Sequence, residues 1–370
     1  MASTKPHAVC IPDGLPDSDP DASQDITLLC ESSMKYCLAP FRDLLIKLNN
    51  SNTNPPVTCI VSDGFMSLFT MTAAEEIGVP IALFNTIAAS TYMGFKQFRT
   101  LVQKGLAPLK DESCFTNGFL DKVVDWIPGM KDIRLKDLPT FFQTTNPNDI
   151  WFNFTMESTD NVHKAAALVF LTFDALEHDV LDALSSMFDQ SLVYAIGPLE
   201  LLISQIPNDP LKHIGYSLWK EETECFEWLK NKAPNSVVYV NFGSVVFSTP
   251  EELVEFGWGL ANSKFPFFWV IRPDLVIGES AVLPPEFVAE TKERGLIASW
   301  CPQEQVLNHP SVGGFLTHCG WNSTIESLTA GVPMLCRPFF GDQQTNCFYT
   351  YGSSFTNLDK LVNQVLLRKS

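Results

Sequence analysis

Residues 300–343 read WCPQEQVLNHPSVGGFLTHCGWNSTIESLTAGVPMLCRPFFGDQ and contain two apolar stretches, GGFLTH and VPMLC, that are short enough to be buried strands. A Gly-containing turn follows the first stretch, and we predict that a helix begins around Asn322 or Ser323 and leads to the second. Nearly continuous apolar strands that alternate with helices are typical of a parallel sheet covered on both faces. This stretch therefore predicts a doubly wound α/β domain.

The same alternation extends toward the amino terminus. Strands are predicted in the second half at SVVYVNFGS, FPFFWVIRP and LIAS, and in the first half at PHAVCIP, VTCIVSD, PIALFNT, AALVFLTF and LVYAIGPL. We predict an α/β protein with two Rossmann-like domains, residues 1–200 and 236–351, facing across a cleft. A Pro-containing linker at residues 201–235 joins them, and a terminal helix at residues 352–370 returns to the first domain.

Polar or aromatic residues follow the apolar strands of the second half, at the strand ends where open α/β sheets bind ligands. Trp300 follows LIAS and could stack a flat base. The helix start near Asn322 offers unpaired amides and a positive dipole end to a phosphate. Asp342 and Gln343 follow VPMLC and suit sugar hydroxyls. Residues suited to bind a flat base, a phosphate and sugar hydroxyls therefore follow one another along the chain.

Ser323 and Glu326 have a second interpretation. A Ser that precedes a Glu by three positions at a helix start fits a capping box, in which both side chains satisfy helix amides. A Glu326 carboxylate used in this way would not be available to a ligand. The sequence leaves both interpretations open.

Residues 300–343 resemble, along their whole length, the signature box of plant secondary-metabolite UDP-glycosyltransferases. The resemblance implies the GT-B fold, with the acceptor bound by the amino-terminal half, UDP-glucose as donor and no metal. Arg337 stands where the family usually has Trp, which would place a charge beside the sugar pocket. The implied donor contacts are Trp300 and Gln303 on the uracil, Glu326 on the ribose, Ser244, His318, Asn322 and Ser323 on the diphosphate, and Trp321, Asp342 and Gln343 on the sugar.

The chain departs from this family in two places. In the family, the first strand leads to a Gly-His turn that carries the catalytic base, whereas here PHAVCIP meets the acidic stretch DGLPDSDPDASQD directly. We predict that a block with this histidine, its helix and at least one further strand is missing. A second block is predicted to be missing between residue 347 and the terminal helix. An aberrant transcript, a gene-model error or an evolved form would each explain two internal gaps.

Without the base histidine, the aspartate that should orient it, Asp63, has no partner, and capping of the helix near Ser67 is the alternative role. We do not expect another histidine to replace the missing base. His7 is predicted to lie in a strand, His163 and His178 on helices, His213 in the linker and His309 in a turn. We therefore expect a glucosyltransferase with impaired activity, exposed strand edges and low solubility. The alternatives are a catalytically silent UDP-sugar-binding protein or a non-functional product. A nicotinamide-dependent oxidoreductase would also have Rossmann-like domains, but no strand of this sequence is followed by the G-x-G-x-x-G signature of such enzymes.

Composition limits the remaining function classes. The 370 residues are long enough for two cores, and the net charge of −17 without a Lys/Arg cluster argues against nucleic acid or anionic membranes. The ten cysteines include no CxxC pair, and no apolar run is long enough to span a bilayer. We expect a cytoplasmic monomer that binds a UDP-sugar and a small hydroxylated plant metabolite. The sequence most resembles the branch of this family whose members glucosylate cyanohydrins, iridoids, other terpenoids and cytokinins.

Overall fold

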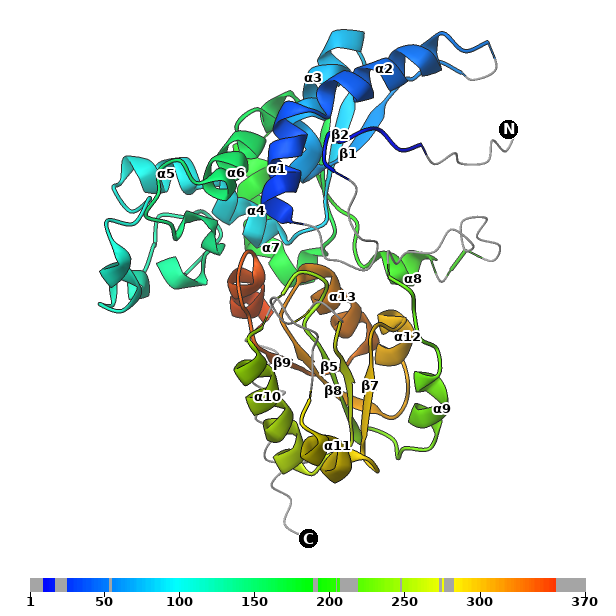
Figure 1. The fold of residues 1–370 in the computed structure, drawn as a ribbon. Helices are drawn as coiled ribbons and strands as arrows, with labels where there is room; N and C mark the ends of the chain where they lie inside the picture. Colours follow the sequence, from blue (N-terminus) through cyan, green and yellow to red (C-terminus); the bar gives the residue numbers. More distant parts are fainter. Residues whose placement is uncertain are drawn as a thin grey trace.

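The computed structural model describes residues 9–16, 25–52, 55–188, 192–203, 205–206, 219–246, 248–272, 275 and 283–350. It contains two parallel sheets, which lie in separate halves of the molecule (Figure 1). The helix predicted at residues 352–370, and His7 and His213, lie outside the described residues.

The first sheet has the strand order β1-β2-β3-β4, and all of its strands are parallel. The predicted strand PHAVCIP is wrong in its described part, because residues 9–12 form no strand. Asp25 accepts from the amides of Thr27 and Leu28 and so begins helix α1 directly after the acidic stretch. The strands are β1 (Ile60–Asp63), β2 (Ile81–Asn85), β3 (Ala167–Phe170) and β4 (Val193–Ala195), and the helices are α1 (Ile26–Lys35), α2 (Leu38–Asn49), α3 (Ser67–Ile77), α4 (Ala89–Lys96), α5 (Phe98–Gln103), α6 (Ile150–Asp160), α7 (Asp174–Met187) and α8 (Leu199–Ile203).

One face of this first sheet is much more exposed than the other. Ile60, Leu83 and Phe170 point into the core of the first half. Strand β1 forms an edge of the sheet, and Val61, which alternates with Ile60 along it, is 73% exposed. At the opposite edge, Tyr194 of β4 is 50% exposed. Parallel sheets usually have helices over both faces, so this half leaves apolar strand surface open to solvent.

The second sheet has the order β7-β6-β5-β8-β9, again with all strands parallel. Tyr239 of β5 packs toward α9 and α12, while the next residue, Val240, packs toward α10 and α11. This two-sided core confirms the predicted doubly wound fold. The elements are α9 (Cys225–Lys230), β5 (Val237–Asn241), α10 (Pro250–Ser263), β6 (Phe267–Val270), α11 (Pro285–Thr291), β7 (Gly295–Ala298), α12 (Gln303–Leu307), β8 (Val312–Thr317), α13 (Trp321–Ala330) and β9 (Met334–Cys336).

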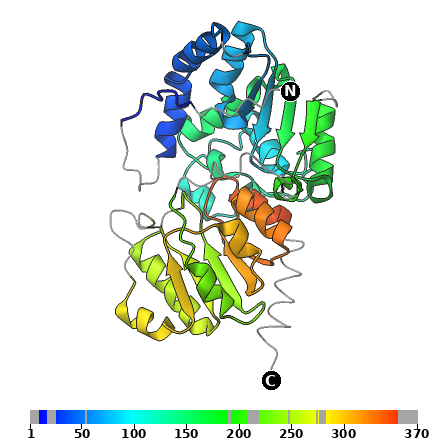
Figure 2. The same ribbon diagram turned by 90° about the vertical axis from the view of Figure 1, so that its right-hand side faces the viewer.

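Residues 341–350 of the second half contact the first half, and residues 343–350 of this segment are helical (Figure 2). The Thr140 amide donates to the Gly341 carbonyl at 2.9 Å, and the Thr345 hydroxyl donates to the Asp137 carbonyl at 2.8 Å. Two sheet domains are thereby held against each other at the carboxyl ends of the second sheet's strands. None of the described helices is both long and apolar enough to cross a bilayer.

Candidate functional site

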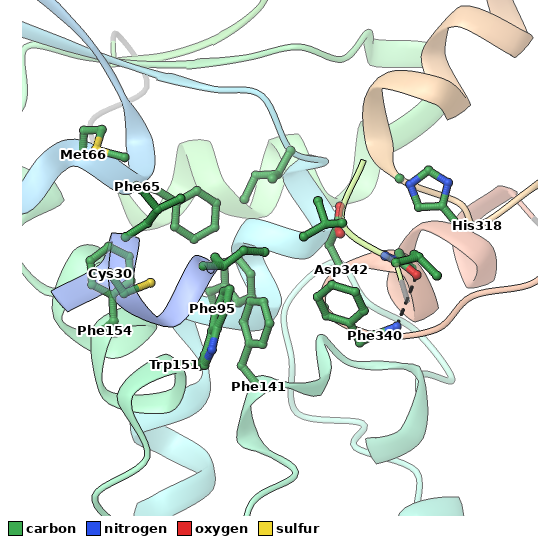
Figure 3. A pocket seen from close by; sticks show the side chains of 18 residues that line it. Cys30, Phe65, Met66, Phe95, Phe141, Trp151, Phe154, His318, Phe340 and Asp342 are labelled. Atoms are coloured by element: carbon green, nitrogen blue, oxygen red, sulfur yellow. Dashed lines mark hydrogen bonds between the residues drawn. The ribbon is translucent and has the colours of Figure 1, made fainter. Parts of the chain in front are cut away.

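A cavity of about 350 Å³ lies between the two halves (Figure 3). The second half contributes the residues that follow β5, β8 and β9, at the edge of the sheet where the sequence predicts ligand binding. The first half contributes mainly apolar and aromatic side chains. The lining residues from the second half are Val245, Val246, His318, Gly320, Phe340, Gly341, Asp342 and Gln343, and those from the first half are Ile26, Leu29, Cys30, Phe65, Met66, Ile87, Phe95, Phe141, Trp151 and Phe154.

Stacked aromatic rings form the first-half wall of the cavity. The Phe141 and Trp151 rings lie 4.7 Å apart between centroids, and the Phe95 ring stacks on Phe141 at 5.8 Å. Phe65 contacts the edge of Phe95. Such rings fix one another and expose flat apolar surface, so this wall suits an apolar ligand skeleton.

His318 follows β8 and lies between two glycines. A Cβ atom at Gly243 would lie 2.6 Å from the His318 Nε2 atom, and one at Gly320 would lie 2.4 Å from it. Gly243 also has a left-handed φ of +75°, which favours glycine. The backbone on both sides therefore leaves just enough room for the imidazole.

The surroundings of His318 keep it neutral. Burial lowers the pKa of His318 to about 4. Its Nδ1 atom is buried and has no hydrogen-bond partner among the described residues. A neutral imidazole in this position can donate or accept one hydrogen bond, but it does not supply a positive charge at pH 7.

Helix α13 begins at Trp321, with Gly320 as its N-cap, one residue before the start predicted around Asn322 or Ser323. No side chain caps this end. The capping-box interpretation is wrong, because Ser323 and Glu326 instead both accept from the Gln303 Nε2 atom, at 2.9 and 2.8 Å. The first amides of the helix have no acceptor within it, and the Asn322 side chain is exposed beside them.

Gln303 joins two other residues of the predicted UDP-sugar site, Ser323 and Glu326, into one hydrogen-bond network. Its Oε1 atom accepts from the Tyr239 hydroxyl at 3.1 Å and from Asn241 Nδ2 at 2.8 Å, while Nε2 donates to Ser323 and Glu326. Burial raises the pKa of Glu326 to about 7, and the hydrogen bond from Gln303 acts in the opposite direction. Glu326 therefore holds a proton in part of the molecules at neutral pH.

Trp300 and Ser244 lie outside the lining of the cavity. Trp300 follows β7, and its ring lies 6.0 Å from the Trp219 ring between centroids, tilted by 32°. The Ser244 carbonyl accepts from the buried Arg272 side chain at 2.7 Å. Both residues lie at carboxyl ends of strands, as predicted, and both strands, β5 and β7, lie on the same side of β8, the strand that leads to α13.

Asp342 and Gln343 both line the cavity. Asp342 accepts from Asn346 Nδ2 at 2.7 Å, and burial raises the pKa of Asp342 to about 6. The Gln343 Oε1 atom accepts from the Phe339 and Phe340 amides at 2.8 and 3.2 Å. These bonds hold the turn that presents Asp342 to the cavity.

Trp321 is placed differently from its predicted role. Its side chain is 3% exposed, its Nε1 atom donates to the Leu171 carbonyl at 2.6 Å, and it packs with Ala88 and Ile325 between the two halves. The indole does not line the cavity, and the contact of Trp321 with the sugar stays a prediction. Its backbone amide, in the first turn of α13, remains at the site.

Arg337 does not line the cavity, and its position beside the sugar pocket stays a prediction. The guanidinium carbon lies 4.9 Å from the centroid of the Phe339 ring, and 5.9 and 5.5 Å from those of Phe242 and Phe256. Such cation–π contacts keep the guanidinium among aromatic rings. No Lys or Arg from the described part of the chain lines the cavity.

Asp63 caps a short helix, as its alternative interpretation suggests. Its Oδ1 atom accepts from the Phe65 amide at 2.8 Å at the start of the 3-10 helix Gly64–Met66, and Thr86 donates to Oδ2 at 3.4 Å. Burial raises the pKa of Asp63. His163 and His178 lie on the surface, and His309 bonds to Ser311 in a turn. Within the described residues, His318 is thus the one histidine that lines the cavity.

The sequence did not indicate the aromatic wall. Phe141 and Trp151 come from short 3-10 turns and the start of α6, where no helix or strand period is present. Asn346 was also missed, although it bridges Asp342 and the Cys319 carbonyl. Only the approach of the two halves identifies these residues as part of a site.

Three comparisons relate this site to known proteins. A family profile described as "UDP-glucoronosyl and UDP-glucosyl transferase" matches residues 217–354. The chain is 57% identical over 351 residues to 7-deoxyloganetin glucosyltransferase from Gardenia jasminoides, which covers 94% of this chain and 72% of that protein. It is 58% identical over 342 residues to (R)-mandelonitrile beta-glucosyltransferase from Prunus dulcis, with 92% and 70% covered. The crystal structure of a UDP-glucose: anthocyanidin 3-O-glucosyltransferase in complex with UDP matches with a TM-score of 0.73 at 29% identity, over 92% of this chain and 70% of that one.

Proposed function

Because this chain belongs to the UDP-glycosyltransferase family and has its GT-B fold, we propose that it transfers glucose from UDP-glucose to a hydroxyl group of a small metabolite held in the cavity between the two halves. The observation that carries this proposal is the arrangement of the cavity. His318, Gly320 and Asp342 form its polar side, and the stacked rings of Phe141 and Trp151 form its apolar side. Donor and acceptor would meet there.

The donor would lie across the carboxyl ends of the second sheet. We propose that Trp300 stacks on the uracil and that Gln303 and Glu326 contact the uracil edge and the ribose. The diphosphate would lie against the α13 start, where free amides, Asn322 and neutral His318 offer hydrogen bonds without a fixed cation. The sugar would then reach the cavity beside Asp342 and Gln343.

The acceptor would be a compact and largely apolar molecule with a hydroxyl group. The aromatic wall offers flat apolar surface, and no Lys or Arg of the described chain lines the cavity to attract an anionic acceptor. The names of the two relatives refer to an iridoid aglycone, 7-deoxyloganetin, and a cyanohydrin, mandelonitrile. We propose that the acceptor of this chain belongs to a similar class of small plant metabolites.

The transfer step needs a route for the acceptor's proton. The acceptor oxygen forms a bond to the anomeric carbon, the bond from this carbon to the diphosphate oxygen breaks, UDP leaves, and the hydroxyl proton must pass to a base or to water. Asp63 is used as a helix cap, and His318 is the one cavity-lining histidine of the described residues. We propose that His318 binds the diphosphate and does not act as the base. We therefore propose slow transfer, reduced by about 10²- to 10⁴-fold because the described residues supply no general base.

A catalytically silent UDP-sugar-binding protein is the second candidate. The same observation on Asp63 favours it, because the carboxylate that should orient a base is occupied by the Phe65 amide and the Thr86 hydroxyl. This candidate shares the donor site with the first and differs only in the transfer step.

Binding and transfer should therefore be measured separately. Calorimetry with UDP should show binding, and this binding should weaken strongly in His318→Ala but not in the matched surface variant His163→Ala. Transfer from UDP-glucose should be faster to an acidic nitrophenol than to an aliphatic alcohol, because the phenol loses its proton more readily. UDP binding without transfer to either acceptor selects the silent candidate. Absence of UDP binding, or equal and fast transfer to both acceptors, would contradict the proposal.

A further inference from the structure

Three cysteines that are far apart in the sequence meet at the carboxyl edge of the second sheet. Cys319 follows β8, Cys336 ends β9, and Cys347 lies on the helical segment 343–350. Their Sγ atoms all lie within 4.8 Å of one another. No other group of three possible metal ligands of this kind is found in the described part of the chain. The pairing of β8 with β9, which sets Thr317 opposite Cys336, brings the first two thiols together.

The size of this triangle is suitable for a metal ion. The centre of a triangle with sides of 4.8 Å lies about 2.8 Å from each corner, and a zinc–thiolate bond is about 2.3 Å long. Each sulfur atom would therefore move inward by about half an ångström at most, which side-chain rotation can provide. Cys319 is buried, whereas Cys336 and Cys347 are partly exposed, so an ion can enter from solvent.

We propose that Cys319, Cys336 and Cys347 form a binding site for a thiophilic cation. Sulfur-only coordination selects soft or borderline ions such as Cu⁺, Cd²⁺ or Zn²⁺ over Mg²⁺ or Ca²⁺. On binding, each sulfur that still carries a proton releases it to solvent and forms a bond to the ion, so no oxidant is required.

The thiol site is connected to the proposed donor site. Cys319 has a left-handed φ of +69° and lies between His318 and Gly320 in the turn that follows β8. Its carbonyl accepts from Asn346 Nδ2 at 2.9 Å, and the same nitrogen donates to Asp342. An ion held by the three sulfurs would therefore tie the turn that carries His318 to the segment that carries Asp342. The proposal does not depend on glucose transfer.

Cadmium is the probe for this site, because its thiolate bonds absorb in the near ultraviolet. Titration of the reduced 370-residue protein with Cd²⁺ should give one tight equivalent with this absorption, and the ion should raise the thermal unfolding midpoint. In Cys336→Ser and Cys347→Ser the affinity for Cd²⁺ should fall by at least about tenfold. Loss of a residue that only supports a metal ligand already costs about 10- to 100-fold in metal affinity, so loss of a ligand should cost no less. Cys114→Ser, which changes a buried cysteine away from this cluster, is the matched control and should bind Cd²⁺ like the unchanged protein.

Two results would overturn the proposal. One is tight Cd²⁺ binding that survives in the Cys336→Ser and Cys347→Ser variants, because the ion would then be held by other residues. The other is the absence of a thiolate absorption band in the unchanged protein. An X-ray absorption spectrum of the Cd²⁺-loaded unchanged protein needs no variant: three sulfur neighbours support the site, and fewer than three contradict it. UDP binding, measured on the same samples, tests the donor site separately.

Discussion

Replacement of Glu326 by Gln tests the buried network around Gln303. The substitution removes a titratable carboxyl group but keeps an oxygen that can accept from Gln303 Nε2, as Glu326 does now at 2.8 Å. Burial raises the pKa of Glu326 from 4.5 to about 7. The folded protein therefore retains a proton between pH 4.5 and about 7 that the unfolded chain has already released.

The size of the effect follows from this difference. Each pKa unit corresponds to about 1.4 kcal/mol, so the rise from 4.5 to about 7 corresponds to about 3 kcal/mol of unfolding free energy. Because the folded state binds the extra proton, stability falls as the pH rises through this window and changes no further above it. Glu326→Gln lacks this loss. Relative to the unchanged protein, it should gain about 3 kcal/mol between pH 4.5 and pH 8.

Urea unfolding followed by tryptophan fluorescence at a series of pH values measures this gain. Asp342, whose pKa burial raises to about 6, titrates in both proteins and cancels in the difference. Glu286→Gln, on the exposed side of α11, is the matched control and should follow the unchanged protein. Parallel stability curves for the unchanged protein and Glu326→Gln between pH 4.5 and pH 8 would refute the reasoning.

The same substitution should weaken donor binding while it stabilises the fold. Ribose hydroxyls donate hydrogen bonds, so they favour the ionised form of Glu326 over the protonated one. UDP affinity of the unchanged protein should therefore rise as the pH increases from 6 to 8. In Glu326→Gln the affinity should be lower and should no longer change in this way, which calorimetry can measure.

Three further predictions concern the fold around the site. Trp321→Phe leaves the buried Leu171 carbonyl without its 2.6 Å partner and should lower the unfolding free energy by about 1–3 kcal/mol in urea titrations; no change would exclude a role of this bond in joining the halves. Gly243 has a left-handed φ, and Gly243→Ala places a Cβ atom against the imidazole of His318. The displaced imidazole should reduce UDP affinity more than tenfold in calorimetry, which corresponds to more than about 1.4 kcal/mol. Unchanged affinity would mean that the diphosphate binds elsewhere. Val61→Lys puts a charge on the exposed edge strand β1 and should decrease aggregation in light scattering without lowering stability; unchanged aggregation would show that this edge is not responsible.

The sequence alone predicted the second sheet well. Its strands are short and apolar and its turns carry Gly or Pro, so local periodicity was sufficient to find SVVYVNFGS as β5 and GGFLTH as β8. The same reasoning failed for PHAVCIP, whose described residues form no strand. A strand needs a neighbour to pair with, and its amino-acid pattern does not guarantee that the neighbour is there.

The positions of the site residues were only partly determined by the sequence. Motif spacing placed His318, Asn322 and Asp342 at strand ends and at a helix start, because these places depend on local chain geometry. Tertiary structure decided which partner each side chain takes. Gln303 comes from another helix and removes Ser323 and Glu326 from the predicted capping box.

Long-range packing also decided two further features. The Trp321 indole bonds to Leu171 in the other half of the chain, so its direction depends on how the halves meet. The three thiols come from two paired strand ends and a helical segment, with no motif spacing that could have revealed them. Sequence pattern fixes where a residue stands along its own element, whereas the contacts of its side chain depend on elements that fold against it from far away in the chain.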